Sequence, residues 1–215
     1  MQQANTAQAK ELEKKKQNLP QAIDLEGAAG EGQEFITAKD TKLPILKILY
    51  ANSPVLNDDD GKYIERAKQG DIYNEVTGSL WKGKEGIIVV PCLYYNTFNE
   101  WKDRGDGPGR PVKIHTDPAI MSETSRGEDN KDRLPNGNYV EDTGNHFVFI
   151  LDKDYLPQEQ ALITMKSTQK KKSKTWNSMM QTRRLKGAKG FFRPPTWATT
   201  YKLTTTKESN SQNHW

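Results

Sequence analysis

The chain has little cysteine and little histidine. Cys92 is its single cysteine, and there are three histidines in 215 residues. A disulfide framework and a cysteine-rich zinc site are therefore excluded. No apolar run approaches the ~20 residues that span a bilayer, and the first residues carry no apolar signal-peptide core. These absences predict a soluble protein of a reducing compartment with no membrane partner, and we expect it in the cytoplasm.

Acidic residues are missing from one long stretch. Between residues 160 and 207 the chain has twelve Lys or Arg and no Asp or Glu, whereas the remainder has twenty basic and twenty-eight acidic residues. Charge segregated in this way favours a polyanionic partner. The same stretch holds several aromatic residues, and cations interleaved with aromatics are typical of surfaces that bind single-stranded nucleic acid.

Composition divides the chain into a tail and one domain. Residues 1–34 are rich in Gln, Ala, Lys, Glu and Gly, which predicts a disordered N-terminal tail. Residues 35–215 are expected to form one nucleic-acid-binding domain. The strongest strand signal is 86–101, which opens with four β-branched residues, and further strands are expected at 146–151, 161–168 and 199–206.

The order of the expected elements indicates a mainly β fold. A helix is expected from Gln169 to about Leu185, with Thr168 as its cap. Residues 43–50 fit a strand or a helix. Residues 103–145 are polar and turn-rich, so they predict a long loop that is functional or disordered. Short strands, one helix and long loops together predict an OB-like small β-barrel.

The start of the expected helix is crowded with lysines. Each lysine there costs roughly 0.3 kcal/mol or more, because the helix N-terminus carries a partial positive charge, whereas an anionic ligand reverses that sign. We therefore expect this segment to neutralise phosphates through Lys170, Lys171, Lys172, Lys174, Arg183, Arg184, Lys186 and Arg193. The long loop is expected to add Lys102, Arg104, Arg110 and Lys113.

Aromatic residues are the candidates for base stacking. Stacking contributes about 1–3 kcal/mol per base, provided that the base is unstacked and within reach. The candidates are Tyr94, Tyr95, Phe98, Trp101, Phe191, Phe192 and Trp197. One face of the strand at 86–101 must pack on the core, so about half of these side chains are expected to be buried.

A metal-dependent nuclease is an alternative function, and it would make the protein an enzyme. Asp71, followed by Glu100 and Lys102 on a later strand, loosely fits the pattern in which two carboxylates hold magnesium and a lysine helps to activate water. The single cysteine and the spacing of the histidines indicate no other metal site. The preferred interpretation is a binding protein without catalysis, metal or cofactor.

Three blocks of sequence resemble a known family. They are residues 95–101 with the following Arg104 to Gly107, residues 134–138, and residues 167–177. Over residues 40–210 the chain is similar to single-stranded DNA-binding proteins of tailed, podovirus-like phages, which have an OB-fold core. The resemblance implies that the protein coats single-stranded DNA during phage replication and recombination, in the host cytoplasm and without a cofactor. A phage structural protein that touches packaged DNA is the other alternative.

The C-terminus departs from that family. Phage proteins of this kind often end in an acidic tail that recruits replication proteins, whereas this chain ends at Trp215 without one. We therefore expect the chain to be truncated, with contacts to replication proteins made through the absent tail; a native mass of 24.4 kDa would contradict this. The choice between DNA and RNA, the site size and the oligomeric state stay open.

Overall fold

The computed structural model describes residues 29–107 and 109–207. The chain divides into two units, with the division between Lys42 and Leu43. The described part of the first unit consists of turns with exposed side chains. Residues 1–28 of the expected disordered tail lie outside the described residues.

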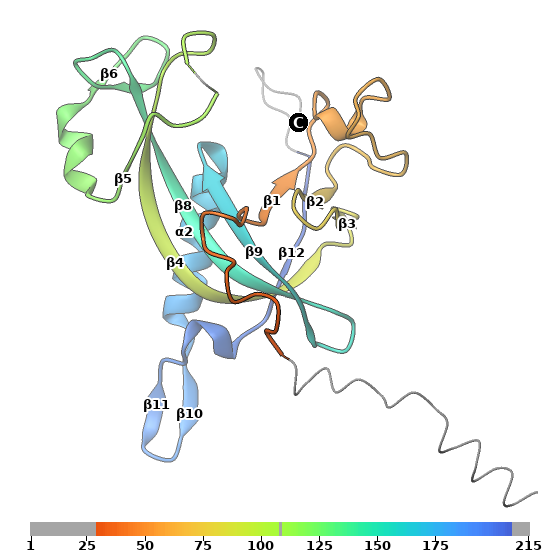
Figure 1. Cartoon of the computed structure of the whole chain (residues 1–215). Helices are drawn as coiled ribbons and strands as arrows, with labels where there is room; N and C mark the ends of the chain where they lie inside the picture. Colours follow the sequence, from red (N-terminus) through yellow and green to blue (C-terminus); the bar gives the residue numbers. More distant parts are fainter. Residues whose placement is uncertain (1–28, 108, 208–215) are drawn as a thin grey trace, which may run out of the picture. The chain divides into compact units, whose positions relative to one another are not determined.

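The second unit is mainly β with one long helix, which confirms the predicted class (Figure 1). The helix is α2, Thr168–Thr182. The short 3-10 helices are η1 (Pro54–Leu56), η2 (Pro118–Glu123) and η3 (Thr196–Ala198). The strands are β1 (Ile45–Ile48), β2 (Ile72–Asn74), β3 (Leu80–Trp81), β4 (Ile87–Trp101), β5 (Lys113–His115), β6 (Ser125–Arg126), β7 (Asp132–Arg133), β8 (Tyr139–Leu151), β9 (Pro157–Lys166), β10 (Leu185–Gly187), β11 (Gly190–Phe192) and β12 (Tyr201–Leu203).

Three long antiparallel strands form the centre of the main sheet. β4 pairs with β8, and β8 pairs with β9, in the order β12-β4-β8-β9-β1-β2-β3. The apolar run at 43–50 fitted a strand or a helix; it contains the strand β1, which runs parallel to β9. A register shift between Pro91 and Leu93 puts a bulge into β4. Beyond the bulge, Tyr94 and Tyr95 point to opposite faces, as alternation requires.

The prediction of a β-barrel is not confirmed: the sheet is not closed, because its edge strands β3 and β12 share no ladder. The two edges meet through Thr205. Its N–H donates to the Gly83 carbonyl at 2.9 Å, and its hydroxyl donates to the Gly70 carbonyl at 2.6 Å. A Cβ on Gly83 would lie 1.9 Å from the Gly70 oxygen, so only glycine permits this approach. Thr205 therefore bridges the gap between the two edges of the sheet.

The core lies between α2 and one face of the sheet. Trp176 of α2 is buried, stacks on His146 of β8 with ring centroids 4.3 Å apart, and meets Tyr201 of β12 edge-on at 5.7 Å. Gly144 lets the helix come close, because a Cβ there would lie 2.6 Å from the Ser173 hydroxyl. In Figure 1, α2 accordingly lies behind the three long strands. No helix among the described residues is long and apolar enough to cross a membrane.

Two expected segments are more ordered than their sequences suggest. The polar stretch 103–145 carries β5, η2, β6 and β7 before β8 begins, and its Leu134 and Val140 form a small core with Phe98 of β4. We call residues 102–138 the upper lobe, after its place in Figure 1. The helix ends at Thr182, earlier than expected, because the residues that follow form the hairpin β10–β11.

Candidate nucleic-acid interface

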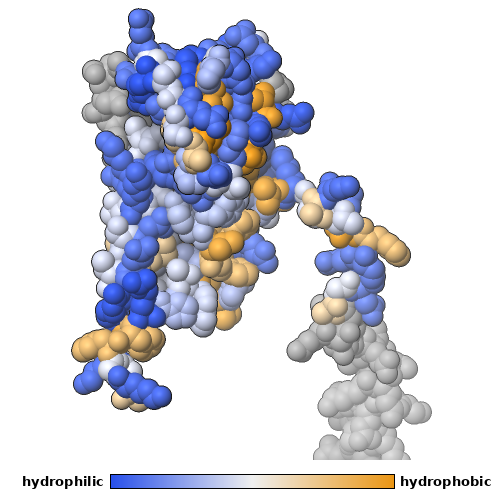
Figure 2. All heavy atoms as spheres, turned by 90° about the vertical axis from the view of Figure 1, so that its left-hand side faces the viewer, coloured by the Kyte–Doolittle hydropathy of each residue, from blue (hydrophilic) through white to orange (hydrophobic). Residues whose placement is uncertain are grey.

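The hairpin β10–β11 projects from the body of the second unit (Figure 1). It is a two-stranded sheet of its own, in which Leu185 pairs with Phe192 and Lys186 pairs with Phe191. Phe191 is 76% exposed and Phe192 is 48% exposed. Figure 2 shows hydrophobic side chains flanked by hydrophilic ones near the end of this projection. Adjacent exposed aromatics on a projecting hairpin are candidates for a binding surface.

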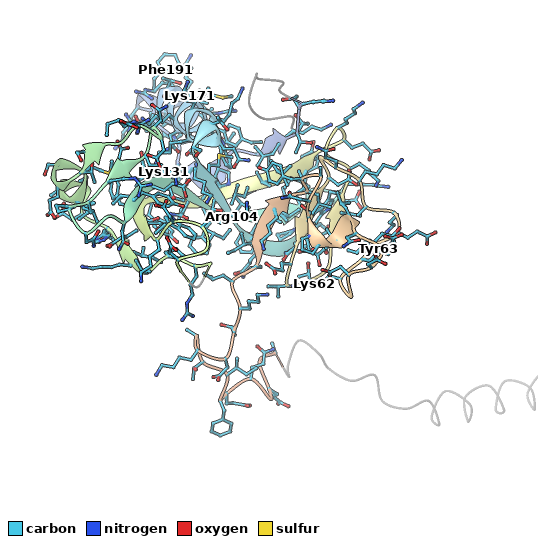
Figure 3. The ribbon with its side chains drawn as sticks, turned by 90° about the horizontal axis from the view of Figure 1, so that it is seen from above. Lys62, Tyr63, Arg104, Lys131, Lys171 and Phe191 are labelled. Carbon is cyan, nitrogen blue, oxygen red and sulfur yellow. The ribbon has the colours of Figure 1, made fainter. Side chains whose placement is uncertain are left out.

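Exposed cations continue from the hairpin along α2. None of them makes an ion pair within the described chain; they are Lys171, Lys174, Arg183, Lys186, Lys189 and Arg193. Figure 3 shows Lys171 and Phe191 on the same side of the molecule, away from Lys62 and Tyr63. We call these six cations together with Phe191 and Phe192 the basic surface. Lys172 is also exposed on α2.

Two of the expected phosphate ligands have structural partners instead. Lys170 is buried, and its ammonium binds Asp142 at 2.6 Å and also Asn96. The expectation that Lys170 presents a free charge is therefore wrong. The Arg184 guanidinium donates to the carbonyls of Gln181 and Arg183, at 2.7 and 2.9 Å. It thus binds carbonyl groups at the C-terminal end of α2 that have no partner within the helix. A cation is stabilised there because the helix C-terminus carries a partial negative charge.

The aromatic candidates divide between the core and the surface. Phe98 is buried in the small core, and Tyr94 lies against His146 with centroids 4.8 Å apart. Tyr95 and Trp101 lie on the face opposite α2. The Lys166 ammonium lies 5.0 Å from the Trp101 ring centroid. Trp197 of η3 is 63% exposed. About half of the candidates were expected to be buried, but Phe98 alone is; Tyr94, Tyr95 and Trp101 are partly exposed, and Phe191, Phe192 and Trp197 are exposed.

The cations of the upper lobe form a separate group. They are exposed, and they are Lys102, Arg104, Arg110 and Lys113. The upper lobe and the hairpin lie toward opposite ends of α2 (Figure 1), and 15 helical residues extend over about 22 Å. The structure therefore separates the cations of the upper lobe from the hairpin, whereas Lys171 and Lys174 lie near the start of α2, at the end of the helix opposite the hairpin.

Ion pairs order the upper lobe, and sequence reasoning missed them. Arg133 binds Asp129 at 2.7 Å and Asp103 at 3.0 Å, and Lys131 binds Asp103 at 2.9 Å. The hydrogen bond from Arg133 is the main cause that lowers the pKa of Asp129 to about 2. Lys131 and Arg133 are therefore compensated locally. Alternating charge at 126–133 is the sequence signal that indicates such pairing.

The carboxylates of the nuclease alternative belong to two separate networks. Asp71 binds Lys82 at 2.8 Å and accepts from the Lys68 N–H. Glu100 accepts from Asn138 and Asn136 and lies 2.9 Å from His115. The bond from Asn138 is the largest cause that lowers the pKa of Glu100 to about 2. Lys102 extends from the end of β4 into the upper lobe. Across residues 29–107 and 109–207, no three His, Cys, Asp or Glu side chains form a group suited to a metal ion.

A buried histidine–serine pair lies beneath α2. His146 Nε2 is 2.8 Å from the Ser173 hydroxyl, and both residues have no exposed surface. The other ring nitrogen, Nδ1, is buried without a hydrogen-bond partner. Burial, followed by the charge of Lys170, lowers the pKa of His146 to about 4. A pair that is sealed from solvent and has no orienting carboxylate serves packing, not nucleophilic catalysis.

The pKa of His146 predicts a loss of stability in mild acid. The unfolded state takes up a proton near pH 6.5, whereas the folded state resists it until about pH 4. Stability is therefore complete above pH 6.5 and falls below it. We expect a loss of about 2 kcal/mol between about pH 7.5 and about pH 5, measured by urea unfolding. The double variant His146→Phe/Ser173→Ala should lose this part of the slope. An unchanged slope would contradict the assignment.

Comparison with known proteins connects the chain to phages. No curated protein and no solved structure matches it. One family model does match, that of the Pam3 phage gp34-like proteins, and the match extends over residues 13–215. Since this is nearly the whole chain, the protein belongs to the Pam3 phage gp34-like family and is a phage protein.

Proposed function

We propose that this phage protein binds single-stranded DNA with little sequence preference, through the basic surface. The observation that carries the proposal is the hairpin β10–β11. It holds Phe191 and Phe192 in solvent, within a stretch that has twelve cations and no acid. Cations neutralise the phosphates, and exposed rings offer stacking positions that accept any base.

The aromatic residues favour single strands over duplexes. In a duplex the faces of the bases are covered by their neighbours, so exposed phenylalanines find no partner there. The exposed side chains of the hairpin are aliphatic, aromatic or cationic, and none is an amide or a carboxylate of the kind that reads adenine or cytosine edges. Binding is therefore expected to depend on salt and on unpaired bases, and hardly on sequence.

The topology supports an OB-like arrangement as part of the proposal. The meander β4-β8-β9 is followed by α2, and β12 then returns to pair antiparallel with β4. A helix between the third and fourth strands of a partly open barrel is the OB order. In this interpretation β1, parallel to β9, supplies the remaining strand. The task would be to coat single-stranded DNA during replication or recombination in the host cytoplasm.

The two other functions are weaker candidates. A nuclease would need Asp71 and Glu100 at one metal ion, but Asp71 binds Lys82 and Glu100 binds residues of the upper lobe. A structural protein that touches packaged DNA would use the same cations, but it would not need exposed phenylalanines. Equal binding to single strands and duplexes would favour that function.

Removal of three cations tests the phosphate contacts. We expect Lys171→Ala/Lys174→Ala/Arg183→Ala to weaken binding of oligo-dT and to flatten the log–log salt dependence by about 2, since each phosphate contact contributes about 0.7. Fluorescence anisotropy at several salt concentrations measures both. Lys170 stays intact in this variant, because its loss would leave Asp142 unpaired and disturb the fold.

Controls separate this outcome from general charge effects. Lys153, an exposed lysine on the β8–β9 turn, provides a single-cation control with an expected slope change near zero. Wild-type protein is also titrated with a duplex of equal length, with magnesium present and the DNA checked on a gel. Shortened DNA would show nuclease activity. A wild-type protein that binds oligo-dT no better than the duplex would overturn the proposal.

A further inference from the structure

A small apolar and aromatic patch lies on the face of the main sheet opposite α2. Its side chains alternate with the core residues along β4 and β8, and the register pairs Leu93 with Phe147. Leu93 is 56% exposed. Tyr95 and Phe147 are partly exposed, and their rings stack with centroids 6.0 Å apart. We call Leu93, Tyr95 and Phe147 the sheet patch.

The sheet patch begins at the bulge of β4, where η3 is attached. The Thr196 hydroxyl of η3 donates to the carbonyl of Cys92 at 3.4 Å, and Cys92 is the residue that the register shift leaves without a partner on β8. In the same segment Pro194 is buried, whereas Trp197 is 63% exposed. Phe192, the last residue of the hairpin, precedes Trp197 by five positions. The chain therefore leads from the exposed rings of the hairpin directly to the border of the sheet patch.

Cations lie on both borders of this face of the sheet. Lys202 of β12 is exposed and pairs with Ile88, whose side chain points away from α2, so Lys202 lies on the same face. Lys166 of β9 is exposed as well, and it pairs with Thr143 on the other border. A strand of DNA that crosses the sheet patch would thus find a cation on either side for its phosphates.

The acids of β4 and β8 do not oppose such a strand. Glu100 and Asp142 lie on the α2 side of the sheet, where Asp142 binds Lys170 at 2.6 Å. Glu141 lies on the face with the sheet patch, but it binds Lys166 at 2.9 Å. β4 and β8 therefore present no unpaired acid on this face.

The size of the sheet patch fits a nucleic-acid base. From Leu93 to Tyr95 it extends over about 7 Å along the strand, and it is about 5 Å wide between the two strands. This is the scale of a base and not of a protein interface, in which each partner buries about 800 Å². The rings of Tyr95 and Phe147 are sequence-tolerant stacking positions, since every base has an aromatic face.

We propose that a single strand of DNA bound at the hairpin continues past Trp197 onto the sheet patch, where its bases stack on Tyr95 and Phe147. The inference rests on the proposed function and extends it from the basic surface to a second subsite on the other face of the sheet. Arg193 and Lys202 bind the phosphates of this segment. The protein then covers a longer piece of DNA than the hairpin and α2 cover by themselves.

Replacement of two rings tests this path by affinity. We expect Tyr95→Leu/Trp197→Leu to bind an oligo-dT of about 15 nucleotides about tenfold less tightly than the wild type, because leucine keeps an apolar side chain but offers no ring for stacking. The salt dependence should stay unchanged, since no charge is removed. Tyr63→Leu is the matched control and should bind as the wild type does; Tyr63 is 42% exposed and lies away from Phe191 in Figure 3.

Cross-linking of the wild type tests the path by position. An oligo-dT in which 5-iodouracil replaces the thymines is bound and irradiated, and tandem mass spectrometry of the digested protein locates the adducts. We expect adducts at Trp197 and at Tyr95 or Phe147, in addition to those at Phe191 or Phe192. The experiment needs no substitution, so it remains decisive even if the double variant folds poorly.

The outcomes separate this inference from the proposed function. Adducts on the hairpin without any at Trp197, Tyr95 or Phe147 overturn the inference and leave the proposed function in place. Wild-type affinity of a folded Tyr95→Leu/Trp197→Leu also overturns the inference, as does an equal loss in Tyr63→Leu. A wild type that binds no oligo-dT overturns both proposals. Circular dichroism of each variant shows whether it is folded.

Discussion

The double variant Phe191→Ala/Phe192→Ala is expected to bind oligo-dT about 30-fold or more less tightly than the wild type. Each stacked base contributes about 1–3 kcal/mol, and 1.4 kcal/mol corresponds to a factor of ten. Both rings are exposed on a hairpin with no core, so their removal should change the free energy of unfolding by less than about 0.5 kcal/mol. Anisotropy titration gives the affinity, and urea unfolding gives the stability.

The salt dependence distinguishes this effect from the loss of cations. Phenylalanine carries no charge, so the slope of affinity against salt should stay at its wild-type value. Tyr155→Ala/Leu156→Ala is the matched control. These side chains are 61% and 60% exposed on the β8–β9 turn, away from the basic surface. A control that loses as much affinity as the hairpin variant would contradict the role of Phe191 and Phe192.

Trp176→Ala is expected to cost about 3–5 kcal/mol of stability, the range for truncation of a large buried aromatic. Trp176 joins α2 to the sheet through its stack on His146 and its edge contact with Tyr201. Its loss leaves a cavity where the long helix packs on both β8 and β12. Urea unfolding monitored by circular dichroism measures the cost.

A neighbour on the same helix provides the control. Met179 is 54% exposed, so Met179→Ala should change stability by less than about 0.5 kcal/mol. If Trp176→Ala costs no more than Met179→Ala, α2 is not fixed to the sheet in the way described. The basic surface would then lack the rigid support that places its cations.

Local patterns predicted the long elements well. β4 was expected at 86–101 and is found at Ile87–Trp101, because a run of β-branched residues followed by strict alternation leaves few other structures. The same alternation predicts that the side chains of Tyr94 and Tyr95 point to opposite faces of the sheet, as they do. It could not decide which face is the core, because both faces carry aromatics. That choice depends on Trp176, which is 82 residues further along the chain than Tyr94.

Polar interactions at long range explain most of what the sequence left undecided. Lys170 looks like its neighbours in a lysine run, but Asp142 of β8 and Asn96 of β4, both far away in sequence, hold its ammonium away from the surface. The upper lobe reads as a loop because Glu100, Asn136 and Asn138 hold it together through hydrogen bonds, which leave no hydrophobic periodicity. The hairpin was missed because β10 and β11 have three residues each, too few for a pattern.

At Thr205 the two edges of the main sheet are held together more weakly than its paired strands. Elsewhere the strands are joined by ladders, but here two hydrogen bonds from one residue bridge the edges, and a typical bond contributes only about 1 kcal/mol. We therefore expect separation of the edges to cost less free energy than unfolding, with β4, β8 and β9 still paired. Amide hydrogens around Gly83 and Thr205 should exchange with solvent through this local opening, on a faster timescale than those of β8. The three long strands β4, β8 and β9 are thus expected to form the stable part of the sheet, and its edges near Gly83 and Thr205 the part that opens locally.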